Sequence, residues 1–142
     1  MQAKVTLLYD VTFAGESGSG HTLVIDGSPD AGGRNIGIRP MEAMLIGMGR
    51  CAAFDVVTIL KKSRVAVRQC WVELHAQRAD DIPMVFTHIS MHFVVQGPAM
   101  KDSQVDRAVN LSEKKYCSAM AMTKKTTVID VSYDVRNEDP PA

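Results

Sequence analysis

Alternation of apolar and polar residues along the chain predicts β-strands in two groups. Near the N-terminus, residues 3–9 and 21–26 form two strands joined through the Gly/Ser run "GESGSG". Later, "QCWVELHAQR" (69–78) and "MVFTHISMHFVV" (84–95) alternate on either side of "ADDIP", and "TTVIDVSYDV" (126–135) alternates again. Each of these three segments has one apolar and one polar face, which is typical of half-buried strands; the first two form an antiparallel pair.

A different periodicity lies between these groups. A Gly/Pro-rich loop, long enough to indicate function, leads to Pro40, and residues 41 to about 63 form a helix that is apolar almost all round. "KDSQVDRAVNLSEKK" (101–115) predicts an amphipathic helix capped by Asp102 or Ser103, and a short helix follows Cys117. Residues 137–142 are expected to be a frayed tail.

The element order is two or three strands, a long helix, two strands, a helix and a strand. This order predicts one α+β domain over residues 1–142, with the long helix packed against mainly antiparallel strands. A helix so apolar needs more cover than one small sheet provides, and a homodimer would supply that cover.

Composition narrows the function classes. The 142 residues carry sixteen basic and sixteen acidic side chains, so the net charge of +0 favours neither nucleic acid nor an acidic membrane as partner. Glu42, Arg50 and Asp55 interrupt the long helix, which favours a core helix over a transmembrane one. Three cysteines without a CxxC motif, and no signal segment, predict a cytoplasmic protein with reduced thiols.

The three thiols differ in their surroundings. Cys70 lies on the apolar face of a predicted strand, where an inert core role is expected. Cys51 follows "GMGR"; Arg50 would favour its thiolate and Asp55 would oppose it. Cys117 follows two lysines at the start of a predicted helix, and both features favour a thiolate.

The histidines predict no metal site. His88 and His92 share a strand face, but four residues of strand separate them by about 13 Å. His21 and His75 offer no ligand spacing, and the chain has no Ser-His-Asp motif, phosphate loop or dinucleotide fingerprint. Neither a metal nor a cofactor is therefore predicted.

Two segments carry a resemblance to a known family. "RPMEAMLIGMGRCAAFDVVTIL" and the later "LSEKKYCSAMA", together with the element order, resemble the OsmC/Ohr family of peroxide reductases. The resemblance implies an intertwined homodimer in which two long central helices cross and sheets from both chains wrap them. It also implies that Cys51 attacks an organic hydroperoxide, that Cys117 forms a disulfide with the resulting sulfenic acid, and that a lipoyl-type dithiol restores both.

The family has an activating pair, an arginine in the early hairpin and a glutamate directly after the helix proline. This chain departs from that pattern. Here Met41 follows the proline, and Glu42 lies nine residues before Cys51, which turns it about 180° away on a straight helix. The early hairpin has no arginine. The possible substitutes are Arg34, Arg39 and Arg50.

Two functions therefore remain open. The first is a thiol-dependent peroxidase using Cys51 and Cys117, with Glu42 and Arg39 as candidate activating residues. The second is a dimeric OsmC-like protein that binds a small apolar or thiol-bearing ligand without turnover. The missing hairpin arginine favours the second, and retention of both cysteines favours the first. Ser118 is a further departure, since it stands where better-known members of the family have a proline.

Overall fold

The computed structural model describes residues 1–138, and the chain divides into two compact units, Met1–Met44 and Leu45–Ala142. The predicted single domain over residues 1–142 stays a prediction.

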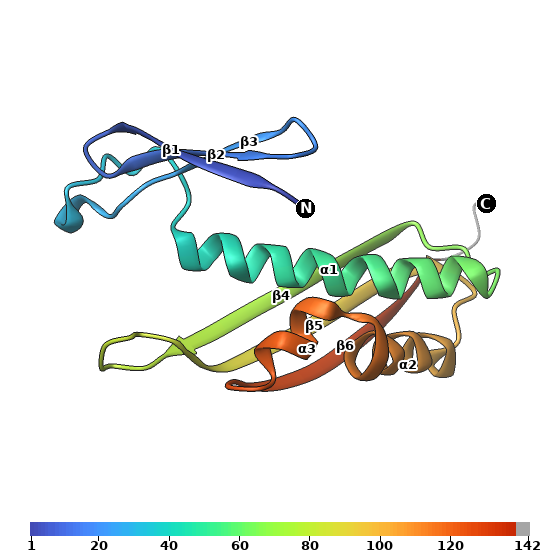
Figure 1. The fold of residues 1–142 in the computed structure, drawn as a ribbon. Helices are drawn as coiled ribbons and strands as arrows, with labels where there is room; N and C mark the ends of the chain where they lie inside the picture. The colour runs from blue at the N-terminus through green and yellow to red at the C-terminus, as the bar shows by residue number, and fades with distance from the viewer. Residues whose placement is uncertain (139–142) are drawn as a thin grey trace. The chain divides into compact units, whose positions relative to one another are not determined.

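The first unit is a three-stranded antiparallel sheet in the order β1-β2-β3 (Figure 1). Its strands are β1 (Ala3–Tyr9), β2 (Thr12–Ser17) and β3 (Thr22–Ile25). The run "GESGSG" is therefore not simply a connection, because its first three residues belong to β2 and only the rest forms the turn. Glycine does not exclude a strand here, since Gly15 is paired in register on both sides, with Val5 and with Leu23.

Buried Asp26 organises the long loop that follows β3. Its carboxylate accepts hydrogen bonds from the Thr12 hydroxyl (2.9 Å) and from the backbone N–H groups of Gly27, Arg34 and Ile36 (2.8, 3.0 and 3.1 Å). The loop also contains the 3-10 turn η1 (Pro29–Ala31). Burial raises the pKa of this carboxyl, but the four donors outweigh burial and lower the pKa to about 2. The loop is thus held by an internal polar core.

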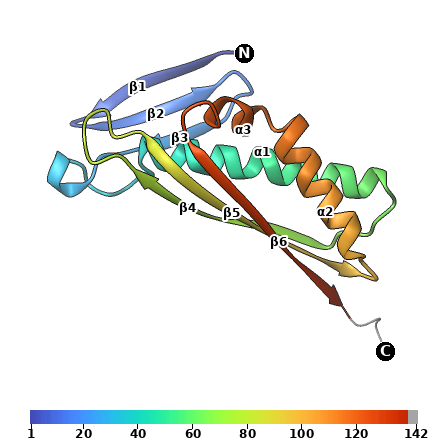
Figure 2. The same cartoon turned by 90° about the horizontal axis from the view of Figure 1, so that it is seen from below.

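The second unit is a three-stranded sheet, in the order β4-β5-β6, with helices on one face (Figures 1 and 2). Helix α1 (Pro40–Lys62) begins in the first unit, and its residues from Leu45 onward belong to the second. The remaining elements are β4 (Gln69–Arg78), β5 (Phe86–Pro98), α2 (Asp102–Leu111), the π-helical turn η2 (Ser112–Tyr116), α3 (Ser118–Thr123) and β6 (Val128–Glu138).

The predicted faces of β5 are confirmed. Ile89, Met91, Phe93 and Val95 are all fully buried, whereas His88, Ser90 and His92 on the other face are only half-buried. Val85 was expected on the apolar face, but it precedes the strand and is exposed.

Helix α1 confirms the predicted long helix. Its buried residues Met48, Ala52, Val56 and Leu60 recur every fourth position and form one stripe. A Cβ on Gly49 would lie 2.7 Å from Leu74 of β4, so this glycine allows the helix to pack closely on the sheet, whereas Gly47 faces open space. By length and composition alone α1 is also a candidate membrane span; its buried stripe favours a core helix.

Strands β5 and β6 are parallel, although the pattern predicted mainly antiparallel strands. The segment α2-η2-α3 forms the crossover that a parallel pair requires, while β4 and β5, joined by a hairpin, are antiparallel. The predicted cap of α2 is wrong by one residue, because Lys101 occupies the N-cap position and Asp102 is already helical.

The predicted frayed tail is wrong for its first two residues. Asn137 and Glu138 belong to β6; Asn137 accepts a hydrogen bond from the Met100 N–H (2.6 Å), and Glu138 forms an ion pair with Arg68. Residues 139–142 lie outside the described residues.

Replacing Asp26 should destabilise the protein. In Asp26→Asn the buried group keeps its size, but one acceptor oxygen becomes an NH₂ donor facing backbone N–H groups. We expect a clearly lower thermal unfolding midpoint at pH 7, while Asp30→Asn, at an exposed site in the same loop, changes it little.

The effect should depend on pH. The folded-state pKa of Asp26 lies below the ordinary value of 3.8, so its stabilisation is full above pH 3.8 and is lost as the pH falls through about 2. The difference between the wild type and Asp26→Asn should therefore shrink in acid. An equal difference at every pH would contradict this account.

Candidate active site

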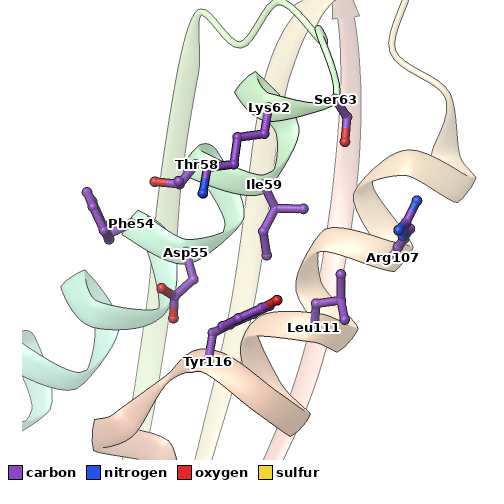
Figure 3. A pocket seen from close by; sticks show the side chains of 9 residues that line it. All are labelled: Phe54, Asp55, Thr58, Ile59, Lys62, Ser63, Arg107, Leu111 and Tyr116. Carbon is purple, nitrogen blue, oxygen red and sulfur yellow. The ribbon is translucent and has the colours of Figure 1, made fainter.

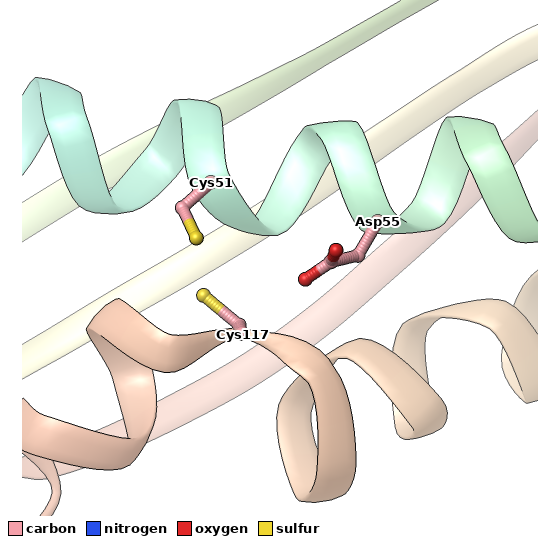
Figure 4. Close-up of side chains that lie close together, drawn as sticks. All are labelled: Cys51, Asp55 and Cys117. Atoms are coloured by element: carbon pink, nitrogen blue, oxygen red, sulfur yellow. The ribbon is translucent and has the colours of Figure 1, made fainter.

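The structure brings Cys51 and Cys117 together, although they are distant in the sequence. Their sulfur atoms and a carboxylate oxygen of Asp55 all lie within 4.8 Å of one another (Figure 4). Cys51 and Asp55 are one turn apart on α1, and Cys117 lies in the crossover between η2 and α3. The two sulfurs point toward each other across the gap between these segments.

A break in the helical crossover positions Cys117. After η2 its backbone becomes extended (φ −71°, ψ 101°), and the residue becomes the N-cap of α3. Its sulfur accepts a hydrogen bond from the Met120 N–H at 3.5 Å. An ion pair between Lys124 and Glu113 (2.6 Å) links the two sides of the break. The predicted short helix after Cys117 is thereby confirmed.

Ser112 fastens this crossover to α1. Ser112 is fully buried, and its hydroxyl lies 3.2 Å from the Ala52 carbonyl, to which it donates, and 3.4 Å from the Asp55 carboxylate. Because Ala52 follows Cys51 directly, this contact fixes the crossover beside the thiol of α1.

Cys51 is the more readily ionised of the two thiols. Burial opposes its ionisation, but hydrogen bonds from the Ala119 N–H, Cys117 and Ser118 outweigh burial and lower the pKa of Cys51. The Ser118 hydroxyl lies 3.9 Å from the Cys51 sulfur. The negative charge of Asp55 acts in the opposite direction, as the sequence predicts.

Cys117 differs from the expectation. The lysines before it predict a thiolate, but burial, together with the nearby Cys51 and Asp55 groups, raises the pKa of Cys117 to about 11. Only 2% of its surface is exposed. Lys115 lies over the Tyr116 ring, 5.3 Å from the centroid, rather than at the sulfur.

Arg50 does not bend back to Cys51. Its guanidinium stacks on the Phe54 ring, 4.6 Å from the centroid, and its charge acts on Asp55. Burial raises the pKa of Asp55, and the Ser112 hydroxyl and Arg50 only partly oppose this shift. The prediction that Arg50 favours the Cys51 thiolate is therefore wrong, because its charge acts on Asp55 instead.

The other candidate activating residues have local partners. The Glu42 carboxylate accepts the Arg39 N–H at 2.8 Å, and the Arg39 side chain donates to the Asn35 side chain (2.7 Å) and the Gly37 carbonyl (3.2 Å). Arg34 binds Asp10 at 3.2 Å. The catalytic use of Glu42 and Arg39 stays a prediction.

The remaining candidates have structural surroundings. Burial raises the pKa of Cys70 to about 11, which agrees with the expected inert role. His88 is held by Asp130 (2.6 Å), and His92 by Ser132 and Asp134 (2.8 and 3.3 Å). Both histidines are therefore satisfied within the sheet face.

A cavity of about 440 Å³ extends from Asp55 along α1 (Figure 3). Aromatic and aliphatic side chains supply much of its wall, and Lys62 and Arg107 supply positive charge. Its lining residues are Phe54, Asp55, Thr58, Ile59, Lys62, Ser63, Arg107, Leu111 and Tyr116.

Sequence patterns did not indicate that two serines lie at the site. Ser118 is a departure from the family pattern, and its hydroxyl is a neighbour of the Cys51 sulfur. Ser112 gave no signal, because one polar residue at the end of an amphipathic helix is normally solvent-exposed.

Comparisons with known proteins agree with the fold. The model of the OsmC-like protein family matches residues 32–132. Protein YhfA of Escherichia coli K12 is 44% identical over 135 residues, which cover 95% of this chain and 98% of that protein.

Solved structures show the same architecture. A hypothetical protein from Aquifex aeolicus is 29% identical with a TM-score of 0.85, and the match covers 97% of each chain. An organic hydroperoxide resistance protein OsmC from Legionella pneumophila is 11% identical with a TM-score of 0.72, covering 95% of this chain and 98% of the other; at this identity it supports the fold alone. The family match extends over most of the chain and includes both Cys51 and Cys117: this chain belongs to the OsmC family.

Proposed function

We propose that the protein is a thiol peroxidase that reduces organic hydroperoxides through Cys51 and Cys117. The observation that carries the proposal is the convergence of these two sulfur atoms from α1 and from the break before α3. Family membership supports the same chemistry, since solved proteins of this fold include an organic hydroperoxide resistance protein.

The proposed reaction has three balanced steps. The Cys51 thiolate attacks one peroxide oxygen, the O–O bond breaks, and the leaving alkoxide takes a proton to become an alcohol. The Cys117 thiol then attacks the Cys51 sulfenic acid, forming a disulfide and releasing water. Finally a dithiol, of lipoyl type by resemblance to the family, reduces the disulfide and is itself oxidised.

The surroundings of the two cysteines support this division of roles. Cys51 is partly exposed and carries the lowered pKa, which suits the residue that meets peroxide as a thiolate. Cys117 is buried and carries the raised pKa, which suits a thiol that reacts only with its neighbour. Ser118 contributes a hydroxyl beside Cys51, where the family's usual proline has none.

The neighbouring cavity supports an organic substrate. Phe54, Ile59 and Leu111 offer apolar surface that hydrogen peroxide could not use but the body of an alkyl or aryl hydroperoxide could. Asp55 lies at this cavity and next to both sulfurs, so it joins the binding space to the reactive pair. We also propose a reducing, cytoplasmic setting, because the cycle consumes dithiols.

The roles of the thiols should separate by intact-mass spectrometry after one equivalent of cumene hydroperoxide. We expect the wild type to lose two hydrogens as the disulfide forms. Cys117→Ser should gain one oxygen, because its sulfenic acid has no partner, and Cys51→Ser should not change, because a serine hydroxyl is barely ionised. Cys70→Ser is the matched control and should behave as the wild type.

Two results would contradict the proposal. Oxygen on Cys117 in the Cys51→Ser variant would reverse the roles. A wild type that stays unchanged would favour the alternative, a protein that binds a small apolar or thiol-bearing ligand without turnover.

We further propose that the protein is a homodimer that covers the outer face of α1. Ile46 and Phe54 are eight residues apart on the same side of this helix and are 57% and 53% exposed. Large apolar side chains exposed on one helix face favour an interface there. Because the family resemblance implies a homodimer, we propose that the partner at this face is a second copy of the same chain.

Sedimentation velocity at micromolar concentration tests the dimer. The wild type should sediment as a dimer, and Ile46→Asp should weaken or abolish it, because a carboxylate would be buried in the interface. Ile82→Asp is the control, since Ile82 is exposed but lies outside α1. A well-folded wild-type monomer would rule out this assembly.

A further inference from the structure

Asp55 is not explained by the peroxidase cycle. Its charge opposes ionisation of both nearby thiols, and no step of the reaction uses it. The cluster instead gathers three groups that all become anions on losing a proton, with their ligand atoms within 4.8 Å (Figure 4). When they are ionised, these three groups repel one another, and a bound divalent cation would attract all three.

We propose that the reduced protein binds one zinc-type cation through the sulfurs of Cys51 and Cys117 and a carboxylate oxygen of Asp55. Two thiolates select Zn²⁺ over Mg²⁺ or Ca²⁺, which prefer oxygen ligands. Three protein ligands leave the fourth tetrahedral position for water or another ligand, as in zinc sites that exchange ligands.

The geometry needs only a small adjustment. Bonds of about 2.3 Å to sulfur place two sulfurs about 3.8 Å apart in a tetrahedral zinc site. The three ligand atoms, which already lie within 4.8 Å of one another, must therefore close by about 1 Å at most. The Ser112 hydroxyl contacts Asp55, and the Met120 N–H contacts the Cys117 sulfur, so two of the ligands already have orienting partners.

The metal and the disulfide are mutually exclusive. Zinc binding releases the thiol protons and occupies both sulfur atoms, whereas disulfide formation removes both as ligands. A bound ion would therefore protect the pair from peroxide. The inference shares its thiols with the proposed peroxidase but does not need turnover, so either can fail without the other.

Metal titration of the reduced protein tests the site. Competition against a chromophoric chelator should show one Zn²⁺ per chain, and Co²⁺ should produce thiolate-to-cobalt charge-transfer absorption with the visible bands of a tetrahedral site. Asp55→Asn keeps the thiols and removes the anionic oxygen, and it should weaken Zn²⁺ binding at least tenfold, about the smallest loss reported even for residues that only support a ligand.

Variants of the three cysteines and of Asp55 serve as controls for the metal titration. Cys51→Ser and Cys117→Ser should lose the charge-transfer band, Cys70→Ser should keep it, and Asp55→Glu should bind more tightly than Asp55→Asn. Circular dichroism checks that each variant folds. The proposal would be overturned if the wild type did not bind Zn²⁺, or if the wild type and folded Asp55→Asn bound Zn²⁺ with equal affinity.

Reaction with a peroxide, with and without bound zinc, distinguishes the metal-site proposal from the peroxidase proposal. Zinc-loaded wild type should resist oxidation by cumene hydroperoxide until a chelator is added. If the metal-free protein also fails to react while zinc still binds, the peroxidase proposal fails and the metal site stands. If the metal-free protein reacts but no zinc binds, the metal-site proposal fails and the peroxidase proposal stands.

Discussion

The buried hydroxyl of Ser112 is the contact on which the site depends. It joins the π-helical turn before Cys117 to the Ala52 carbonyl and the Asp55 carboxylate of α1. Together with the weaker contact between the Ser118 hydroxyl and the Cys51 sulfur, this link sets the position of the crossover along α1. Because the parallel pairing of β5 and β6 forces the chain through a crossover, the fold provides the segment and Ser112 sets where it meets α1.

The site balances opposing electrostatic effects. The Ala119 N–H, Cys117 and Ser118 favour a thiolate at Cys51, whereas burial and Asp55 oppose it. The proposed peroxide reduction would use the first set of effects, and the proposed cation site would use the negative charge of Asp55. Arg50, a candidate from the sequence, stacks on Phe54 and acts on Asp55 rather than on Cys51. Under the two proposals, Cys51 and Cys117 would either form a disulfide or bind a metal ion together with Asp55.

Periodicity predicted most of the fold, because each element buries one regular face. Helix α1, the alternating faces of β5 and the short helix after Cys117 all follow from local patterns. The parallel pairing of β6 and the polar core around Asp26 did not, since both depend on contacts between distant residues. The cysteine pair was identified by family resemblance, and helix periodicity placed Asp55 beside Cys51, whereas the approach of Cys117 to Asp55 and of Ser118 to Cys51 depends on contacts between distant residues.

The central claim is that Cys51 and Cys117 of one chain form a reactive pair. The most direct test is peptide mapping of the protein after mild oxidation with diamide, which needs no peroxide. The account predicts one cross-linked peptide pair containing Cys51 and Cys117, with the band remaining at the single-chain position on a non-reducing denaturing gel. A cross-link that includes Cys70, or one that joins two chains, would contradict it.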